Sequence, residues 1–494
     1  MRSSFNDKDG DTFFSYLISQ RALISVALAI SVLLFIILKY AFPLPDFFVD
    51  SSNYITWALH NFTVAYRPIG YSVFLKLAHF VSSSPSFTVF IQYCFFVFSA
   101  LFCFFSAEYL FHLPKKFKIP ILILIVCNPV LIFQTNLISS DSLFCSLTIT
   151  WFTACMWIIK KHNWGALVLQ LLFLFFCFQV RYTAMFYPVV ALFAFVFCIG
   201  SIAYRITGGA LTLLVLFFSV ERQMNVVEKE TGTRVFSGFG GWQVANNALY
   251  CYKHIQVNSN DLPDWETQVI DHCVKIYIDS IKQTAGIGAA YLWDPKSPFK
   301  KYLNICARRD RSDYLAAWFT ASRPLGEYGW YIIRHYPAAF TQYFLLPNTT
   351  NYFYPDLEIL ANYDYGNITL TPDTKQWFGL DVDHLDCRFP FLQERIMYIY
   401  PFLSLLLNAF NIAVIIYFIC RRAFYKKRMS VAMNRLFIIW CIFYCSFMVF
   451  SIFAAAISIR FLDILFVIGI IVPFLFFEKE SLLPGNIKHT FPVR

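Results

Sequence analysis

Long apolar stretches alternate with short polar loops along most of this chain, and their lengths predict membrane-spanning helices. The first stretch, residues 22–42, contains a single charged side chain, Lys39. A helix of about twenty residues crosses a hydrocarbon core of about 30 Å. Applied to the whole chain, this pattern predicts an all-α polytopic membrane protein with about ten spans. The other nine are expected at residues 86–111, 119–138, 143–159, 165–180, 183–202, 210–220, 396–420, 436–456 and 463–477.

Two longer polar stretches separate these spans. The first, residues 43–85, includes an apolar run at 71–81 that predicts a short helix along the membrane surface. The second, residues 221–390, has mixed composition and is long enough for a separate domain. An amphipathic helix is expected within it at 265–283. The sequence thus predicts a membrane module at 1–220, a mixed exoplasmic domain at 221–390 between spans seven and eight, and a second membrane module at 391–494.

Composition agrees with a membrane chain, and charge predicts its orientation. Hydrophobic residues make up 58% of the sequence and charged residues 14%, less charge than a soluble surface carries. Basic side chains gather in loops on one side, which are Lys115, Lys116, Lys118, Lys160, Lys161 and the segment 421–435. Such loops are cytoplasmic, so both termini are expected in the cytoplasm. The net charge of +10 therefore reflects topology, and nucleic acid is not an expected partner. The interpretation favours a bacterial cytoplasmic membrane, with the endoplasmic reticulum as the eukaryotic equivalent.

Four of the fourteen cysteines fall in the segment 221–390, and the rest lie in or beside apolar spans. The four are Cys251, Cys273, Cys306 and Cys387. An even number on an oxidising face favours two disulfides, whose pairing the sequence leaves open.

Ionisable residues at the edge of a membrane are costly and so indicate function. The predicted topology puts seven of them at the outer edge: Asp46, Asp50, Arg67, Asp141, Arg181, Arg460 and Asp463. Because all seven lie on one side of the bilayer, these carboxylates and arginines are expected to converge on one cavity.

Asp50 is the favoured catalytic residue of this group. A carboxylate just after the first span can take a proton from an acceptor hydroxyl or amine while the acceptor attacks an activated sugar. The alternative is that Asp50 caps a helix starting near Ser51, and Asp46 is the rival base. For Asp141, just before the fourth span, a capping role is favoured on spacing alone.

Arg181 and Arg460 each interrupt or border apolar sequence near the outer edge. The planar guanidinium group binds phosphate through paired hydrogen bonds, so either residue can hold the phosphate of a lipid carrier. The alternative is that each side chain extends along the bilayer to reach the interface with water. The sequence contains no Gly-rich phosphate loop, HExxH helix or GxSxG elbow.

Several of these segments resemble a known family in order and in membrane side. DSSNY at 50–54 and RPIGYSVFL at 67–75 resemble the first outer loop of C-type glycosyltransferases, which include protein O-mannosyltransferases and lipid A aminoarabinose transferases. LISSDSLF at 137–144 resembles their second outer loop, VRYTA at 180–184 an Arg-containing turn, and RF at 460–461 a late Arg-Tyr element. Many members have two adjacent acids in the first loop. Here Ser51 follows Asp50, so the choice between Asp50 and Asp46 stays open.

The resemblance implies transfer of a sugar from a polyprenyl-phosphate donor on the exoplasmic face, to a glycan, lipid or protein acceptor. It implies Asp50 as the base, Asp141 as an orienting group, and Arg181 and Arg460 as phosphate ligands. Three further residues in or beside the matched segments, Tyr54, Arg67 and Tyr182, are assigned to substrate binding in the same way. The lipid phosphate leaves as a stable anion, so no nucleotide site is required. Members differ in metal use, which leaves a divalent metal open as a cofactor.

Two other functions compete with glycosyl transfer. A multi-pass transporter or lipid flippase also suits about ten spans, and a receptor or scaffold would use the segment 221–390 as a binding module. Catalysis requires clustered carboxylates and arginines at the outer edge, transport requires polar groups at mid-membrane, and a scaffold requires neither.

Overall fold

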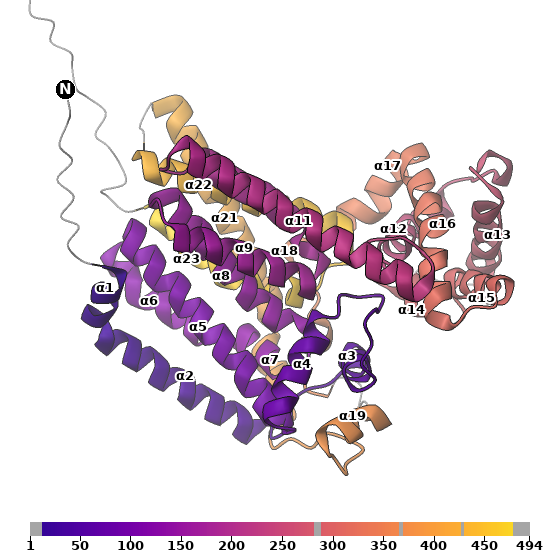
Figure 1. Cartoon of the computed structure of the whole chain (residues 1–494), viewed down its shortest axis with the longest axis horizontal. Coiled ribbons are helices and arrows are strands. Elements are labelled where there is room, and N and C mark those ends of the chain that lie inside the picture. The colour runs from indigo at the N-terminus through magenta and orange to yellow at the C-terminus, as the bar shows by residue number, and fades with distance from the viewer. Residues whose placement is uncertain (1–11, 281–287, 365–368, 426–428, 478–494) are drawn as a thin grey trace, which may run out of the picture.

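The computed structural model describes residues 12–280, 288–364, 369–425 and 429–477. Every secondary-structure element named within these ranges is a helix. Long apolar helices form a bundle, and a group of shorter, more polar helices extends from one end of it (Figure 1). The predicted all-α class is confirmed.

Seven helical segments in the described residues are long and apolar enough to cross a membrane, and two shorter apolar helices accompany them. The helix α8 is the most enclosed of these, with every residue from Ser140 to Ile159 buried. The bundle comprises α2 (Arg21–Ala41), α5 (Pro85–Phe111), α6 (Lys115–Val126), α7 (Pro129–Asn136), α8 (Ser140–Lys160), α9 (Trp164–Val180), α10 (Tyr187–Phe197), α11 (Ile202–Thr231), α21 (Tyr400–Tyr425), α22 (Val431–Ala454) and α23 (Ile468–Leu475). The short helices α1 (Phe13–Ser19) and α20 (Leu392–Met397) lead into α2 and α21.

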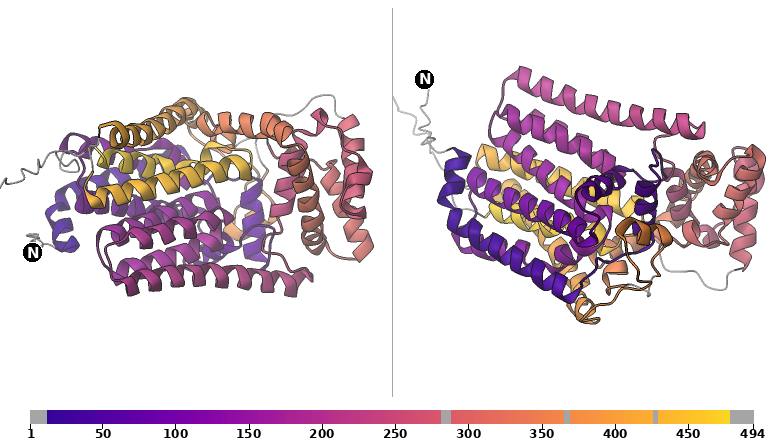
Figure 2. Two further views of the ribbon diagram at one scale, coloured as in Figure 1. Left: turned by 90° about the horizontal axis from the view of Figure 1, so that it is seen from above. Right: turned by 60° about the horizontal axis from the view of Figure 1, so that its bottom comes forward.

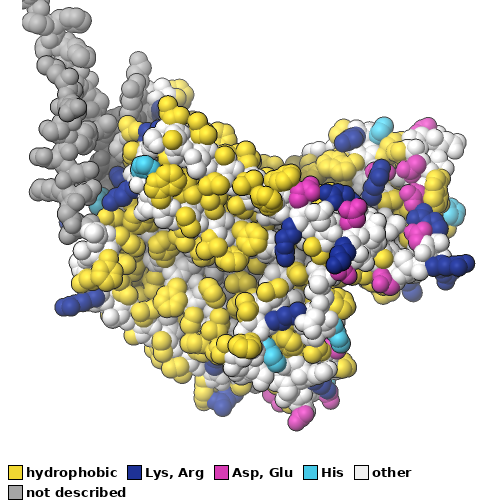
Figure 3. All heavy atoms as spheres, in the orientation of Figure 1, with side chains coloured by type: hydrophobic (Ala, Val, Ile, Leu, Met, Phe, Trp, Pro, Cys, Tyr) yellow, Lys and Arg dark blue, Asp and Glu magenta, His cyan; other side chains and the backbone are white. Residues whose placement is uncertain are grey.

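Peripheral helices of the bundle expose continuous apolar faces. Val32, Leu33 and Ile36 are exposed on α2, and Phe217 and Phe218 on α11. Both helices lie at the margin of the bundle (Figure 2). Hydrophobic side chains cover this face of the bundle, whereas charged side chains gather on the polar extension (Figure 3). An apolar surface of this extent fits contact with lipid rather than water.

Four predicted spans differ from the helices observed. The span at 119–138 is two helices, because Pro129 begins α7 and Asn128 caps it through a side-chain bond to the Val130 amide. The span at 210–220 is part of the thirty-residue helix α11, so the predicted module boundary at residue 220 falls inside a helix. The segment 463–477 is a 3₁₀ turn, η7 (Asp463–Phe466), followed by only eight residues of α23. The 183–202 span begins as the 3₁₀ turn η1 (Tyr182–Phe186) before α10.

The predicted mixed domain at 221–390 is helical in its described residues and consists of two parts. The first has a core of its own around Trp242, Trp318 and Tyr328. Gly241 lets two of its helices approach closely, since a Cβ there would lie 1.7 Å from the Ser322 carbonyl oxygen. Its main helices are α12 (Gly240–Leu249), α13 (Trp265–Ser280), α14 (Ala290–Trp293), α15 (Pro298–Asp310), α16 (Tyr314–His335) and α17 (Pro337–Phe340). The amphipathic helix predicted at 265–283 is confirmed as far as Ser280, and its last residues lie outside the described ranges.

The second part, the described residues of the segment 346–390, packs back onto the bundle. Tyr352 and Trp377 belong to the core of the bundle. This part contains α18 (Leu346–Phe353) and α19 (Pro372–Phe378). It covers the first loop, which forms α3 (Val49–Leu59) and α4 (Gly70–Val81). The Thr56 hydroxyl of α3 donates to Asp373 of α19 at 2.6 Å. The helix predicted at 71–81 is confirmed as α4.

The expected disulfides are wrong, because Cys251, Cys273, Cys306 and Cys387 are all free thiols. The first three are buried in the core of the α12–α16 unit or beside it, and Cys387 packs against the bundle. Their role is that of small apolar side chains.

Candidate functional site

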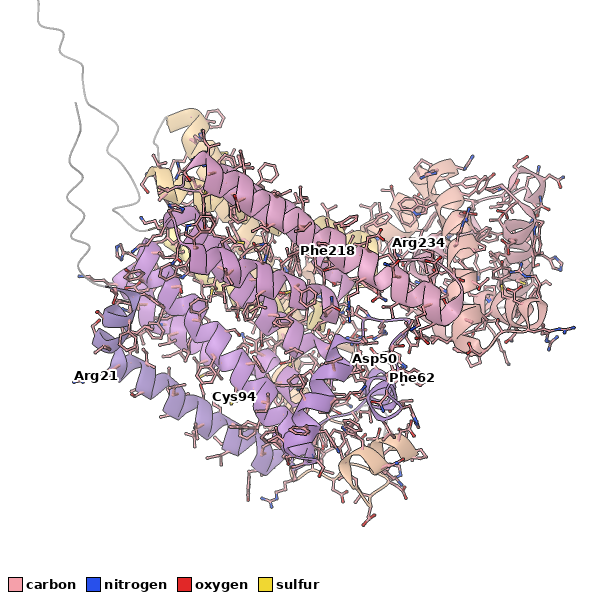
Figure 4. The ribbon with its side chains drawn as sticks, in the orientation of Figure 1. Arg21, Asp50, Phe62, Cys94, Phe218 and Arg234 are labelled. Atoms are coloured by element: carbon pink, nitrogen blue, oxygen red, sulfur yellow. The ribbon has the colours of Figure 1, made fainter. Side chains whose placement is uncertain are left out.

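Two carboxylates and three arginines meet at the end of the bundle nearest the polar extension. Arg67 pairs with Asp50, and Arg181 pairs with Asp141. Arg460 Nη1 lies 3.3 Å from Asp141 Oδ2 and 3.7 Å from Asp50 Oδ2, so it joins the two pairs. Asp50 lies near the polar extension, whereas Arg21, the first residue of α2, lies at the far end of the bundle (Figure 4). These five residues are called the charge cluster below. The predicted convergence of outer-edge carboxylates and arginines is present for these five residues.

Asp50 occupies the first turn of α3 and does not cap it. Phe48 is the N-cap residue, and its amide donates to the Ser51 hydroxyl at 3.1 Å. The Ser51 hydroxyl in turn donates to the Ile138 carbonyl at 2.6 Å, which ties α3 to the loop before α8. The capping role considered for Asp50 is therefore wrong, and its carboxylate faces arginines instead.

Asp141 likewise lies in the first turn of α8 and leaves capping to a neighbour. Ser139 is the N-cap residue and accepts from the Asp141 amide at 3.3 Å. The Ser139 hydroxyl also donates to the Asp141 carboxylate. The side chain of Asp141 is about 1% exposed, so its charge depends on Arg181 and Arg460 for compensation.

The side chains of Arg181 and Arg460 turn toward the charge cluster and do not extend to the interface with water. Arg181 is the extended residue between α9 and η1, and Arg460 lies in the 3₁₀ turn η6 (Ile459–Phe461). Both contact the Phe461 ring, whose centroid lies 5.0 Å from the Arg181 guanidinium carbon and 4.6 Å from that of Arg460. The alternative of arginines reaching for water is therefore wrong for both residues.

The arginines keep Asp50 ionised in spite of its burial. Burial alone would raise the pKa of Asp50, but Arg67 and then Arg460 outweigh that effect and hold the pKa below its usual range. The pKa of Arg67 is raised, since the attraction of Asp50 exceeds the effect of burial. A carboxylate held by two arginines is a weak base until one of them moves away.

Asp46, the rival base, lies outside the charge cluster. It precedes α3, and its carboxylate accepts from the Asp364 amide at 3.2 Å. Its backbone forms an isolated bridge to Leu137. Burial and the neighbouring Asp364 carboxylate raise its pKa well above the usual range. Asp46 thus joins the first loop to the segment 346–390.

The two tyrosines predicted to bind substrate have different surroundings. Tyr54 is buried beside the cluster, and its hydroxyl lies 3.0 Å from the Ser140 hydroxyl. Tyr182 points away, and its hydroxyl donates to the Phe236 carbonyl at 3.4 Å. Tyr182 therefore contacts the segment after α11 rather than the arginines.

Sequence reasoning missed Glu358 and Gln134 at the cluster, and it named Asp463 without predicting its contact with Gln134. Glu358 Oε2 accepts from Arg460 Nε at 2.8 Å, although the two are far apart in the chain. Gln134 donates to Asp463 Oδ2 at 2.7 Å and to the Arg460 carbonyl at 3.1 Å. No local pattern marks Glu358 or Gln134, because only the packing of α7, η6 and the segment 346–390 brings them together.

A cavity of about 90 Å³ opens beside the cluster. Its polar wall is formed by four charged side chains, and its remaining wall is mainly apolar. The charged residues are Asp141, Arg181, Arg460 and Asp463, and the apolar ones include Phe447, Phe450 and Ala454 of α22. The cavity therefore places two guanidinium groups and two carboxylates beside an apolar wall.

Within the described part of the chain, no three His, Cys, Asp or Glu side chains are grouped in a way that would hold a metal ion. No protein-family model, curated protein or solved structure matches this chain. The functional argument therefore depends on the geometry of the charge cluster.

Proposed function

We propose that this protein is a membrane glycosyltransferase that moves a sugar from a polyprenyl-phosphate donor to an acceptor at the exoplasmic face. The observation that carries the proposal is the charge cluster itself. Two carboxylates and three arginines from distant segments meet at one end of the apolar bundle. Buried charge of this kind is costly and is retained at functional sites.

The cluster contains the groups that the reaction requires. Asp50 removes a proton from the acceptor nucleophile, whose electron pair forms a bond to the anomeric carbon of the donor sugar. The bond between that carbon and the phosphate oxygen breaks, and its electrons leave with the polyprenyl phosphate. Arg181 and Arg460 stabilise the resulting phosphate charge. Attack from the side opposite the phosphate inverts the anomeric configuration.

The position of Arg460 couples donor binding to activation of the base. In the structure this guanidinium group is shared between Asp50, Asp141 and Glu358. The donor phosphate is a diester with one negative charge, and it competes with these carboxylates for the guanidinium group. When Arg460 turns to the phosphate, Asp50 loses a positive neighbour and becomes a stronger base.

The cavity supports a lipid-linked donor over a water-soluble one. Arg181 and Arg460 on its polar wall can contact a phosphate, and part of its apolar wall is formed by α22, one of the candidate membrane-spanning helices. A lipid flippase would require polar groups through the depth of the bundle, where Gln170, Asn408 and Asn411 are buried, whereas the charged residues of the cluster gather at one end.

The test is transfer of labelled sugar from polyprenyl-phosphate donors by the purified full chain, with Asp50→Asn beside the wild type. We expect a loss of about a thousandfold, within the usual range for removing a general base. Asp46→Asn is the matched control, because Asp46 is a buried carboxylate of the same loop that faces a backbone amide. It should retain transfer.

Normal turnover of Asp50→Asn together with loss in Asp46→Asn would move the role of base to Asp46. A wild-type protein that transfers from no donor but carries lipid or solute across vesicle membranes would replace the transferase with a transporter.

A further inference from the structure

A cluster of aromatic rings runs from the charge cluster into the α12–α16 unit. The Arg67 guanidinium carbon lies 5.7 Å from the Phe239 ring centroid. Tyr66, the residue before Arg67, has its ring centroid 5.1 Å from that of Trp318 and 5.9 Å from that of Trp293. The rings thus form a continuous path from the arginine that pairs with Asp50 to the polar extension.

Four of these rings lie nearly parallel. Trp242 and Trp318 stack at 3.8 Å with planes 5° apart, and Phe239 lies 8° from the plane of Trp318. The Trp293 plane is 21° from that of Trp318 and 27° from that of Phe239. Trp242 and Trp318 are fully buried, which explains them as core. Their indole N–H groups donate to the Trp318 and Gly238 carbonyls respectively, both at 3.0 Å.

Two rings at the edge of this cluster are not explained as core. Trp293 is 39% exposed and Tyr314 is 57% exposed. Within the residues that the structure describes, the Trp293 indole N–H has no hydrogen-bond partner. A flat aromatic face with an adjacent free N–H matches the apolar face and hydroxyl rim of a sugar ring.

Lys300 supplies an uncompensated positive charge at the same place. Its ammonium nitrogen lies 4.4 Å from the Trp318 ring centroid, 5.4 Å from that of Trp293 and 5.3 Å from that of Tyr314. It donates to the Tyr314 hydroxyl at 2.6 Å. Among the described residues no carboxylate forms an ion pair with it. Burial lowers its pKa to about 8. Cation–π contacts stabilise such a charge partly, and an anionic ligand would do so further.

We propose that Trp293, Tyr314 and Lys300 form an acceptor site that binds a sugar ring carrying an acidic substituent. This inference rests on the proposed function, and it specifies the acceptor as an acidic glycan rather than a plain lipid or peptide. The sugar ring stacks on Trp293, and the acidic group pairs with Lys300. Ring contacts through Phe239 and Tyr66 connect this site to Arg67, the partner of Asp50.

The direct test is saturation-transfer NMR with the purified full chain and a panel of oligosaccharides. Each member ends in a uronic acid, a sialic acid or a sugar phosphate, and each is paired with its neutral counterpart. We expect binding of at least one acidic member, weakened about tenfold by Trp293→Ala, which corresponds to about 1.4 kcal/mol. Lys300→Met keeps the apolar stem and should remove the preference for the acidic member over its neutral counterpart.

Trp265→Ala is the matched control, because Trp265 is an exposed tryptophan of the same unit outside the aromatic cluster. It should bind like the wild type. Tyr314→Ala provides a second variant in case Trp293→Ala folds poorly. Failure of the wild type to bind any member would overturn the proposal. So would binding by Trp293→Ala and Tyr314→Ala that is as strong as that of the wild type.

Two outcomes separate this inference from the proposed function. If the wild type binds acidic glycans but transfers no sugar from any donor, the acceptor site stands and the transferase assignment fails. If sugar is transferred to an acceptor that lacks a sugar ring, and Trp293→Ala leaves the rate unchanged, the transferase stands and the acceptor site fails.

Discussion

Two regions of this molecule bury aspartates, and the negative charges of these aspartates are compensated in different ways. In the α12–α16 unit, Asp271 is fully buried and accepts from the Tyr252 and Tyr328 hydroxyls at 2.6 and 2.9 Å. Ser259 and Lys275 satisfy its other oxygen, each at 2.8 Å. At the end of the bundle, Asp50 and Asp141 instead face the three arginines Arg67, Arg181 and Arg460.

The difference indicates which aspartate is structural and which is functional. The partners of Asp271 are mostly neutral hydroxyl groups from nearby helices, and together they satisfy both of its oxygens. A carboxylate of this kind fixes local packing. The charge cluster instead compensates its carboxylates with three arginines beside a cavity, an arrangement of buried charges that is typical of functional sites.

The largest effect that tests this comparison is the stability change in Asp271→Ala. The substitution leaves two buried tyrosine hydroxyls without their acceptor, so we expect a loss of about 3 kcal/mol in the free energy of unfolding. The measurement is the thermal unfolding midpoint of the purified full chain in detergent. Asp279→Ala, an exposed position on the same helix, is the control and should change the midpoint little. An unchanged midpoint in Asp271→Ala would remove the structural half of the comparison.

A smaller effect is expected on the pH dependence of transfer in Arg67→Gln. The base form of Asp50 is its ionised form, so kcat/KM falls as pH decreases through the pKa of Asp50. Arg67 lowers that pKa, and its loss should move the acidic limb of the profile to higher pH. Arg67→Lys keeps the charge and should leave the limb near its original position. A limb that stays in place in Arg67→Gln would show that Asp50 is not the titrating base.

The smallest effect is expected in Glu358→Gln. Its side chain is 44% exposed, and an ion pair of this exposure contributes less than about 1 kcal/mol. Because Glu358 competes with the donor phosphate for Arg460, we expect KM for the donor to fall about twofold with kcat unchanged. Asp383→Asn, which removes an exposed carboxylate of the same segment, is the control. A rise in KM would mean that Glu358 positions Arg460 for the donor.

The sequence alone determined the membrane class and most of the helices. Runs of apolar residues long enough to cross a bilayer require an intrahelical partner for every backbone amide, so their pattern predicts helices directly. It also selected seven charged residues beside such runs, because these are few; the five of the charge cluster meet, whereas Asp46 lies outside it. It failed where helix ends depend on local chemistry, as at Pro129 and in the 3₁₀ turns around Arg460.

Only the tertiary structure decided between the roles left open for those residues. Spacing favoured a capping role for Asp141, but Ser139 caps α8 and leaves the carboxylate to the arginines. The same holds for the pairing of Arg460 with Glu358 and for the aromatic cluster around Lys300, whose members lie far apart in the chain. The apolar periodicity of a helix predicts which of its faces is in contact with an apolar environment. The partner of a buried charge depends on which distant segments pack against it, and no local pattern specifies that.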